Sequence, residues 1–186
     1  MYRAVAYMTL KNNIEPKEDN PAFVDMLNNL DIDIKYIDDI PNVFVDGENV
    51  TAYLREKEVA LNASVVAKVG LVREKLVDFQ QNFAKTHDVV MDGRDIGTKV
   101  IPDTKTKFFL TASVEERSKR RYLEEKHTGI TLEQIQKDIE ERDRNDYTRK
   151  ISPLVKAEGA IEIDTSDLTV EEVVQLMLDK VEENVL

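Results

Sequence analysis

The sequence of 186 residues contains no cysteine, and no stretch of it approaches the ~20 consecutive apolar residues that a membrane-spanning helix needs. Without cysteine there can be no disulfide, no thiolate metal site and no cysteine nucleophile, so any catalysis must use other side chains. The first residues, MYRAVAYM, also lack the layout of a signal peptide. We therefore expect a cytoplasmic protein that does not associate with a membrane.

Positive charge is scarce as well. The sequence has 26 Lys and Arg residues against 37 Asp and Glu residues, which gives a net charge of -11 at pH 7. Such a charge repels polyanions at long range, so we expect no sequence-independent binding to DNA or RNA. A small anion can still be held locally by arginine, whose planar fork grips phosphate or carboxylate through two hydrogen bonds. Clustered arginines are therefore the first candidates for a functional site.

Short apolar runs alternate with helical patterns over roughly the last hundred residues. Strands are predicted at 89–91, 108–110 and 161–163. The sequence signature of a capping box, Ser or Thr followed three residues later by Glu, predicts that helices begin just after Ser113 and Thr169. This alternation predicts an α/β fold in which helices cover both faces of a parallel sheet. Ligands of such folds bind beyond the carboxyl ends of the strands, here near Asp92, Thr111 and Asp164.

The N-terminal part has a different pattern. Residues 20–50 contain an Asn20-Pro21 helix start, a helical apolar pattern, two short strands and an Asp46-Gly47 hairpin signal. This pattern predicts a small α+β lobe.

One candidate site is the segment 91–98, Met-Asp-Gly-Arg-Asp-Ile-Gly-Thr, which directly follows a predicted buried strand. Two carboxylates, one arginine and two glycines at such a position predict a loop that binds an anion and recognises a base. The alternative is an ordinary turn with a local Asp-Arg ion pair, since Asp and Gly are common turn residues.

A second candidate is the helix that Thr131 and Gln134 open. Its apolar stripe continues at the same spacing into Arg142, Asp146 and Arg149. Burying three charged groups is costly unless they are paired, so this end of the helix is expected to face a polar cleft that binds an anion. A solvated helix end with Arg-Asp pairs four residues apart explains the pattern equally well.

A third candidate is the group of three arginines, Arg117, Arg120 and Arg121, on the preceding helix. This helix and the Thr131 helix form a predicted hairpin that turns at His127-Thr128-Gly129, and such a hairpin could fold over a phosphate. Without neighbouring evidence, a solvated face with glutamate partners is the favoured explanation of these arginines.

These motifs together resemble those of bacterial cytidylate kinases: MYR at the start, DGRDIGT after a strand, and ERDRNDYTR followed by ISPL. The resemblance covers nearly the whole chain. It implies a P-loop kinase fold that transfers the γ-phosphoryl group of ATP to CMP or dCMP, with Mg²⁺, to give CDP or dCDP. It also implies a monomer with a single kinase domain at 1–186, which contains a monophosphate-binding lobe at 20–69 and a helical lid at 114–149.

The resemblance further implies roles for individual residues. The cytosine edge would be read by Ser64, Arg73 and Asp95. The monophosphate would be held by Arg3, Arg94 and Arg149, and the ribose or its neighbouring phosphate by Arg142 and Asp146. Tyr2 would line the same pocket, and Asp92 would orient Mg²⁺ through water. The lid over ATP would contain Arg117, Arg120 and Arg121, and the residues closest to the chemistry would be Arg94, Asp92 and Arg149.

The resemblance is incomplete at the donor site. The family's loop for the ATP phosphates, G-x-x-x-x-G-K-S/T, is not formed by any of the six glycines of this sequence. We expect the 186 residues to be an incomplete or inactive form, with a wrongly assigned start as the favoured explanation; a truncated paralogue and a fragment complemented by another chain are the alternatives. A non-catalytic nucleotide-binding remnant and a purely structural α/β protein also stay open.

Overall fold

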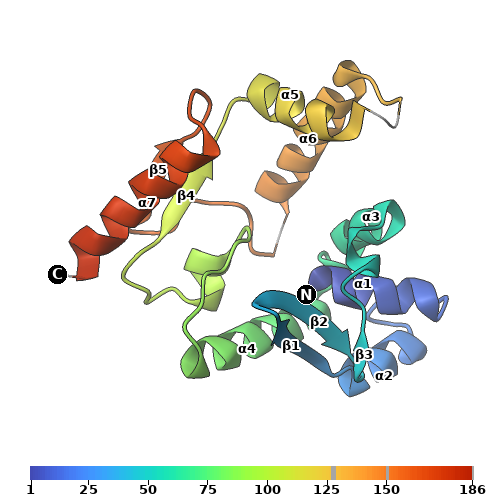
Figure 1. The fold of residues 1–186 in the computed structure, drawn as a ribbon. Helices are drawn as coiled ribbons and strands as arrows, with labels where there is room; N and C mark the ends of the chain where they lie inside the picture. The colour runs from blue at the N-terminus through green and yellow to red at the C-terminus, as the bar shows by residue number, and fades with distance from the viewer. Residues whose placement is uncertain (127–128, 150, 186) are drawn as a thin grey trace. The chain divides into compact units, whose positions relative to one another are not determined.

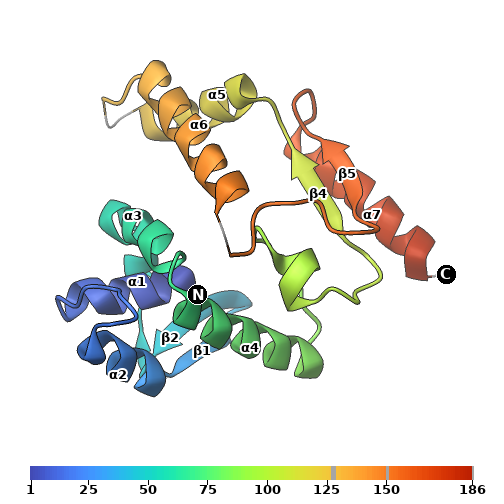
Figure 2. The same ribbon diagram turned by 180° about the vertical axis from the view of Figure 1, so that it is seen from behind.

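The computed structural model describes residues 1–126, 129–149 and 151–185 of the chain. They form two compact units, Met1–His87 and Asp88–Leu186. The ribbon of each unit can be followed by its labels in Figure 1 and from behind in Figure 2.

The first unit is a small α+β structure, as the sequence pattern predicts. Its helices and strands are α1 (Tyr2–Lys11), α2 (Pro21–Asn29), β1 (Ile32–Ile37), β2 (Ile40–Val45), β3 (Glu48–Asn49), a 3₁₀ turn η1 (Tyr53–Arg55), α3 (Lys57–Val66) and α4 (Gly70–Thr86). The predicted start of α2 is confirmed, because the Asn20 side chain accepts a hydrogen bond from the Ala22 N–H at 3.1 Å. Proline follows at the first helical position, where its missing N–H costs nothing.

Two tight turns connect the three strands into an antiparallel sheet. Ile32 pairs with Val45 and Ile37 with Ile40 in the first hairpin, and β3 pairs with β2 in the second. The predicted turn at Asp46-Gly47 is confirmed, with φ angles of 50° and 82°. Two consecutive positive φ angles match the right-handed twist of the flanking strands and favour glycine at the second position.

The apolar core of the first unit lies between its helices and the sheet. Phe23 of α2, Val5 of α1 and Leu76 of α4 are completely buried. Leu76 lies on the buried face of α4 together with Val72. This core holds together the helices that carry four of the predicted site residues.

The second unit contains the parallel strands. Its described elements are the π-helical turn η2 (Ile96–Val100), β4 (Phe108–Thr111), α5 (Val114–Glu125), α6 (Leu132–Thr148), β5 (Ile161–Asp164) and α7 (Val170–Val185). Phe108 pairs with Ile161 and Thr111 with Asp164 in parallel register. The predicted α/β fold with a parallel sheet is confirmed. Part of the predicted turn at His127-Thr128-Gly129 lies outside the described residues.

The predicted strand at 89–91 is wrong. These residues have no regular secondary structure, and Val90 is 99% exposed. A strand exists only when a neighbour completes its hydrogen bonds, and within the described residues β4 pairs with β5 rather than with this segment. A short apolar run therefore indicates the propensity of a segment to form a strand, but it does not show which strand would pair with it.

Side-chain caps begin all three long helices of the second unit. Ser113 and Thr131 accept hydrogen bonds from backbone N–H groups three residues later, at 3.1 and 3.2 Å. The capping box at α7 is complete, since the Glu172 N–H donates to Thr169 Oγ1 at 3.2 Å and the Thr169 N–H donates to Glu172 Oε2 at 2.8 Å. These local bonds explain why the helix starts were predictable.

The capping box makes the stability of α7 pH-dependent. The backbone N–H of Thr169, and then its side chain, lower the pKa of the Glu172 carboxyl. The folded pKa is therefore below the unfolded one, so this stabilisation is complete above the unfolded pKa and is lost as the pH falls through the folded pKa. In urea unfolding, wild type should exceed Glu172→Gln in stability at about pH 7, and the difference should disappear as the pH falls through the folded pKa of Glu172. A difference that persists in acid would contradict this account.

Candidate active site

The segment 92–95, which predicts an anion-binding loop, forms an irregular turn in the second unit and runs into η2. The Asp95 side chain is buried, at 7% exposure, whereas Asp92 and Arg94 are exposed. The Asp95 carbonyl accepts hydrogen bonds at 2.8 to 3.3 Å from the backbone N–H groups of Thr98, Lys99 and Val100. Turns of this π type are rare and frequently mark functional sites.

Gly97 allows this turn to lie close to a distant segment. A Cβ atom at this position would lie 3.2 Å from the Cβ of Ala157 and 3.3 Å from the Cδ of Lys107. Both distances are shorter than ordinary van der Waals contact, so a larger residue would push the turn away. Gly97 therefore allows the turn to pack against Ala157, in the segment that precedes β5.

A charged cluster joins this turn to the end of α6. Arg94 Nε donates to Asp146 Oδ2 at 3.0 Å, and Arg149 Nη1 lies 3.5 Å from Asp146 Oδ1. Their side chains are 43%, 17% and 16% exposed for Arg94, Asp146 and Arg149. One carboxylate between two guanidinium groups leaves a net positive charge, which suits an anionic ligand. Arg142 lies one helical turn before Asp146 on α6 and is exposed.

The chain that follows α6 fixes the far side of this cluster. Arg149 Nε donates to the Ser152 carbonyl, and the Leu154 N–H donates to the Asp146 carbonyl at 2.8 Å. The segment ISPL, residues 151–154, thus folds back on the end of the helix. Asp146 and Arg149 are therefore largely shielded from solvent, whereas Arg142 of the same stripe is exposed.

Arg117 connects the two helices of the predicted lid. Its guanidinium donates two parallel hydrogen bonds to the Asp143 carboxylate, at 3.1 and 2.8 Å, and its Nε donates to the Ala112 carbonyl at 3.0 Å. Such a two-bond pair has a defined geometry as well as a favourable energy. It therefore holds α5 and α6 side by side, as both ribbon views show (Figures 1 and 2).

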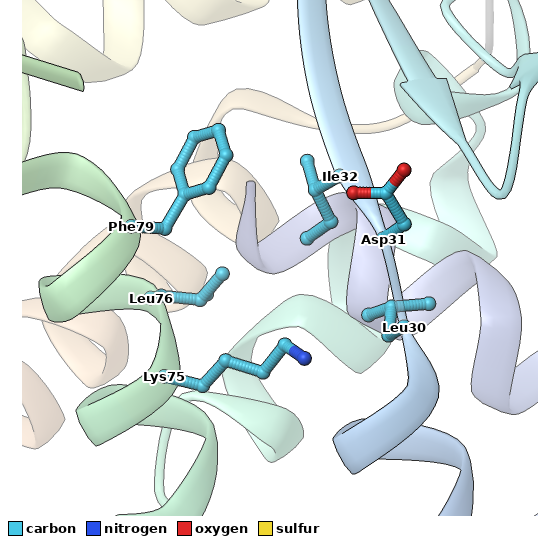
Figure 3. A pocket seen from close by; sticks show the side chains of 6 residues that line it. All are labelled: Leu30, Asp31, Ile32, Lys75, Leu76 and Phe79. Atoms are coloured by element: carbon cyan, nitrogen blue, oxygen red, sulfur yellow. The ribbon is translucent and has the colours of Figure 1, made fainter. Parts of the chain in front are cut away.

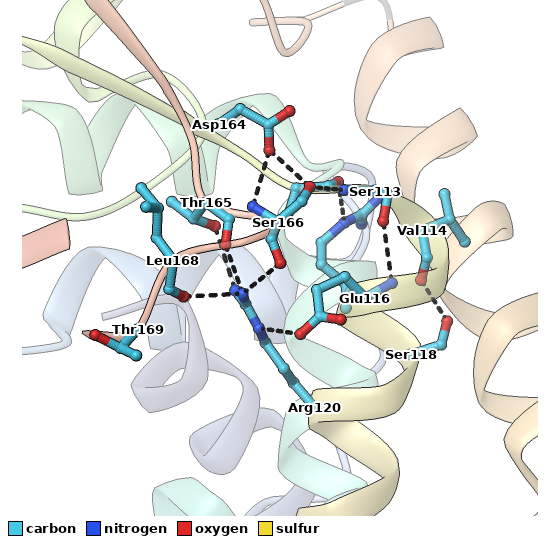
Figure 4. Close-up of polar contacts among 12 residues, drawn as sticks. Ser113, Val114, Glu116, Ser118, Arg120, Asp164, Thr165, Ser166, Leu168 and Thr169 are labelled. Atoms are coloured by element: carbon cyan, nitrogen blue, oxygen red, sulfur yellow. Dashed lines mark hydrogen bonds and ion pairs between the residues drawn. The ribbon is translucent and has the colours of Figure 1, made fainter. Parts of the chain in front are cut away.

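Arg120 fixes the loop between β5 and α7 to α5 (Figure 4). Its Nε donates to Glu116 Oε1 at 3.0 Å and its Nη1 to Thr165 Oγ1 at 3.2 Å. Its Nη2 donates to the backbone carbonyls of Thr165, Ser166 and Leu168. One guanidinium thus organises the backbone at the carboxyl end of β5. By contrast, Arg121 pairs with Glu125 on its own helix, in agreement with the expected glutamate partners.

A second set of bonds fixes the same loop. The Ser113 N–H donates to Ser166 Oγ at 2.9 Å, and Asp164 Oδ1 accepts from both the Oγ and the N–H of Ser166, at 2.6 and 2.9 Å. The hydrogen bond from the Ser166 side chain, and then that from its backbone, lower the pKa of the Asp164 carboxyl. The strand end at Asp164, where the fold predicts a site, is therefore anionic and well ordered by hydrogen bonds.

The first unit brings another group of predicted residues together. The Arg73 guanidinium lies over the ring of Tyr2, 5.7 Å from its centroid, and donates to the Ala67 carbonyl at 3.2 Å. Arg73 is only 4% exposed. A buried arginine at this distance from an aromatic face makes a favourable cation–π contact. Arg73 and Tyr2, both predicted site residues, thus form one structural group.

Arg3 follows Tyr2 on α1, and Ser64 lies on another helix of this unit. Arg3 on α1 donates from Nη1 to the Leu54 carbonyl at 2.9 Å, which holds its side chain across the η1 turn. Ser64 lies on α3 and is exposed. Tyr2, Arg3, Ser64 and Arg73 therefore belong to the first unit, whereas the other predicted site residues belong to the second.

A pocket in the first unit contains none of the predicted residues (Figure 3). Its volume is about 290 Å³, and it lies between the start of β1 and α4. The lining residues are Leu30, Asp31, Ile32, Lys75, Leu76 and Phe79. It is a separate feature of this lobe and not the candidate active site.

Comparison with known proteins decides the family. The sequence model of the family described as cytidylate kinase matches residues 1–183. The chain is 50% identical over 181 residues to a cytidylate kinase of Caldicellulosiruptor bescii, a match that covers 96% of this chain and 80% of the relative. It is 47% identical over 184 residues to a cytidylate kinase of Listeria monocytogenes, covering 98% and 81% of the two chains. The chain belongs to the cytidylate kinase family.

Membership in the cytidylate kinase family makes this chain a phosphotransferase that acts on nucleotides. Within the described residues, no helix is both long enough and apolar enough to cross a bilayer. The sequence resemblance to this family is thus confirmed, together with the fold class. The roles of individual residues stay predictions.

The sequence alone identified the arginines but not their partners. The carbonyls of Thr165 and Leu54 have no motif that marks them, because these contacts join segments far apart in the chain. The Ala67 carbonyl, six residues before Arg73, is likewise unmarked, and Asp143 lies in a quoted motif that does not say which arginine it binds. The position of Asp143 within the ERDRND run is the one sequence feature that could have pointed to it as the partner of Arg117.

The Arg120 contacts lead to a stability prediction. Arg120→Ala should destabilise the chain by about 1–2 kcal/mol, because several charge-assisted hydrogen bonds are lost from a partly exposed group. Arg120→Lys should recover less than half of this loss, since a point charge cannot replace the planar fork. Urea unfolding measures the loss, and hydrogen exchange should show faster exchange at residues 165–169.

Arg121→Ala is the matched control, because its salt bridge to Glu125 is a partly exposed pair on one helix. Such pairs contribute about 0.3–0.5 kcal/mol. Equal effects of Arg120→Ala and Arg121→Ala would contradict a special role of Arg120 in holding the loop.

Proposed function

We propose that this chain transfers the γ-phosphoryl group of ATP to CMP or dCMP, giving CDP or dCDP. The observation that supports this most directly is the Asp146 carboxylate between Arg94 and Arg149. Its net positive charge fits a nucleotide phosphate. The relatives are named cytidylate kinases, and we take cytosine as the base from that name.

The cytosine edge would be read by three side chains of different character. The base offers an amino donor, which a carboxylate such as that of Asp95 accepts well. Its ring nitrogen and carbonyl oxygen are acceptors, which the Arg73 guanidinium and the Ser64 hydroxyl can satisfy as donors. The burial of Asp95 and Arg73 favours this assignment, because buried polar groups discriminate strongly against ligands that leave them unpaired.

The phosphate and sugar would contact the other arginines. Arg3, Arg94 and Arg149 would hold the monophosphate, and Arg142 and Asp146 the ribose or its neighbouring phosphate. Tyr2 would line this pocket beside Arg73. Arginines that position and neutralise phosphate oxygens can catalyse phosphoryl transfer without a protein nucleophile, since positioning and charge stabilisation account for most of the catalysis.

Hydrated Mg²⁺ fits the donor set of this chain. The described residues contain no group of three or more His, Asp or Glu side chains that could enclose a metal. Mg²⁺ commonly keeps its waters and binds through one or two carboxylates and the substrate phosphates. The exposed Asp92 would hold it through water, and the bound ion would neutralise charge on the phosphates. ATP would be covered by Arg117, Arg120 and Arg121.

In this proposal, residues 20–69 are the monophosphate-binding lobe and residues 114–149 the lid of a single domain, 1–186. The protein would act as a cytoplasmic monomer. Because the sequence has no G-x-x-x-x-G-K-S/T loop, we propose that the 186 residues bind CMP but transfer phosphate poorly until such a loop is supplied.

CMP binding can be tested by calorimetry on the 186-residue chain. We expect CMP to bind more tightly than UMP or AMP, and Arg149→Ala to weaken CMP binding about 10- to 100-fold through the loss of charge-assisted hydrogen bonds. Arg144→Ala is the matched control, because Arg144 is an exposed arginine of the same helix. Tighter binding of UMP or AMP would refute the base assignment. Lost stability with unchanged CMP affinity in Arg149→Ala would instead favour a structural network.

Turnover separates the enzyme from a non-catalytic nucleotide-binding protein. The chain extended by the strand and glycine-lysine loop of a cytidylate kinase should release ADP in a CMP-dependent manner, because this loop binds the donor phosphates through its N–H groups and lysine. CMP binding without ADP release by the extended chain would support the non-catalytic alternative.

A further inference from the structure

Helices α1 and α3 of the first unit pack through small apolar side chains. Val5 and Ala6 of α1 are completely buried, and Val59 and Val66 of α3 are 2% and 0% exposed. Apolar contact is non-directional, so it defines the position of one helix along the other less sharply than a hydrogen bond does. Arg3 of α1 already binds the Leu54 carbonyl just before α3, and a further directional contact lies within the helix pair itself.

A polar contact that is half-buried at Asn62 and buried at Thr9 provides such a direction. Asn62 Nδ2 of α3 donates to Thr9 Oγ1 at 2.7 Å and to the Ala6 carbonyl at 3.2 Å. Thr9 Oγ1 donates to the same carbonyl at 2.7 Å, and Thr9 is 2% exposed. Sliding by one turn, about 5.4 Å, would break both bonds of Asn62 and leave the Thr9 hydroxyl without its partner on α3. A single buried asparagine fixes the register of coiled coils for the same reason.

The two helices held in this way carry predicted substrate contacts. Tyr2 and Arg3 begin α1, and Ser64 follows Asn62 by two residues on α3. At about 1.5 Å rise per residue, Ser64 lies about 3 Å along the axis from the contact and moves with it. The Tyr2 ring in turn contacts Arg73. The register of α3 on α1 therefore sets the position of Ser64 relative to Tyr2 and Arg73.

We propose that Asn62, through Thr9, is a positioning residue that places Ser64 for discrimination between CMP and UMP. This inference rests on the proposed function, because it assumes that Ser64 and Arg73 contact the base. It adds a residue that belongs to none of the motifs of the sequence. Asn62 does not contact the substrate in this proposal and acts only through the helix register.

The test uses Asn62→Ala, Thr9→Ala and the double variant. Each single change removes the hydrogen bond between Asn62 Nδ2 and Thr9 Oγ1 and should lower the melting temperature, and the loss in the double variant should be smaller than the sum of the two single losses, because the two side chains share this bond. The ratio of CMP to UMP affinity should fall about tenfold in Asn62→Ala and stay low in the double variant, because the register is then unfixed. A merely structural contact would change the melting temperature and leave this ratio unchanged.

Thr51→Ala is the matched control. Thr51 Oγ1 accepts from the Val43 N–H at 2.8 Å and donates to Asn49 Oδ1 at 2.7 Å, so it is a hydroxyl of the same unit that joins sheet residues outside the site. Its loss should lower stability without changing the CMP to UMP ratio. An equal fall of the ratio in Thr51→Ala would overturn the proposal, because general destabilisation would then explain it.

Helix register can be measured without any ligand. The chain has no cysteine, so Leu10→Cys and Leu61→Cys introduce two specific sites for spin labels on α1 and α3. Both leucines are exposed, at 43% and 64%. Pulsed electron paramagnetic resonance should give one narrow distance distribution with Asn62 present and a broadened or shifted one with Asn62→Ala.

These measurements separate the proposals. An unchanged label distance in Asn62→Ala would overturn the register contact, and a changed distance with an unchanged CMP to UMP ratio would overturn its role in base discrimination. No CMP binding by the wild-type chain would overturn the proposed function and the base-discrimination role with it, while the label distances would still decide the register contact.

Discussion

The candidate active site depends on the compensation of charge at Asp146. This carboxylate lies at the end of α6 and accepts from Arg94, while Arg149 approaches its other oxygen. Two guanidinium groups this close would repel one another without it, and the carboxylate without them would be costly to bury. The charges of these three side chains do not cancel, because two guanidinium groups face one carboxylate and the sum is one positive charge. In the proposed function an anionic ligand would balance this charge, and the ISPL segment fixes the geometry from the other side.

The remaining arginines show how the same chemistry serves different tasks. Arg117 joins two helices through a carboxylate, Arg120 holds a loop through backbone carbonyls, and Arg73 lies buried over an aromatic ring. What they share is a planar, permanently charged group with several donors in fixed directions. In a chain with excess negative charge, many acceptors are available to each arginine, and the fold determines which of them each arginine binds.

This explains how far the sequence could predict the structure. Helix starts at Asn20, Ser113, Thr131 and Thr169 were predictable because the capping bond joins residues two or three positions apart. The strand at 89–91 was predicted wrongly because a strand needs a neighbour that local sequence does not specify. The site followed the same rule: arginine type and spacing identified Arg94 and Arg149, but nothing local predicted that Thr165 or Asp143 would be a partner of the lid arginines.

The way Arg120 holds the loop after β5 also affects how this loop can vary. Its Nη2 contacts are to carbonyl oxygens of the main chain, which every amino acid carries. Substitutions at 166 and 168 therefore keep these acceptors, as long as the backbone path is preserved. The side-chain chemistry of this loop can thus change more freely than the residue at position 120, whose guanidinium supplies several donors in fixed directions.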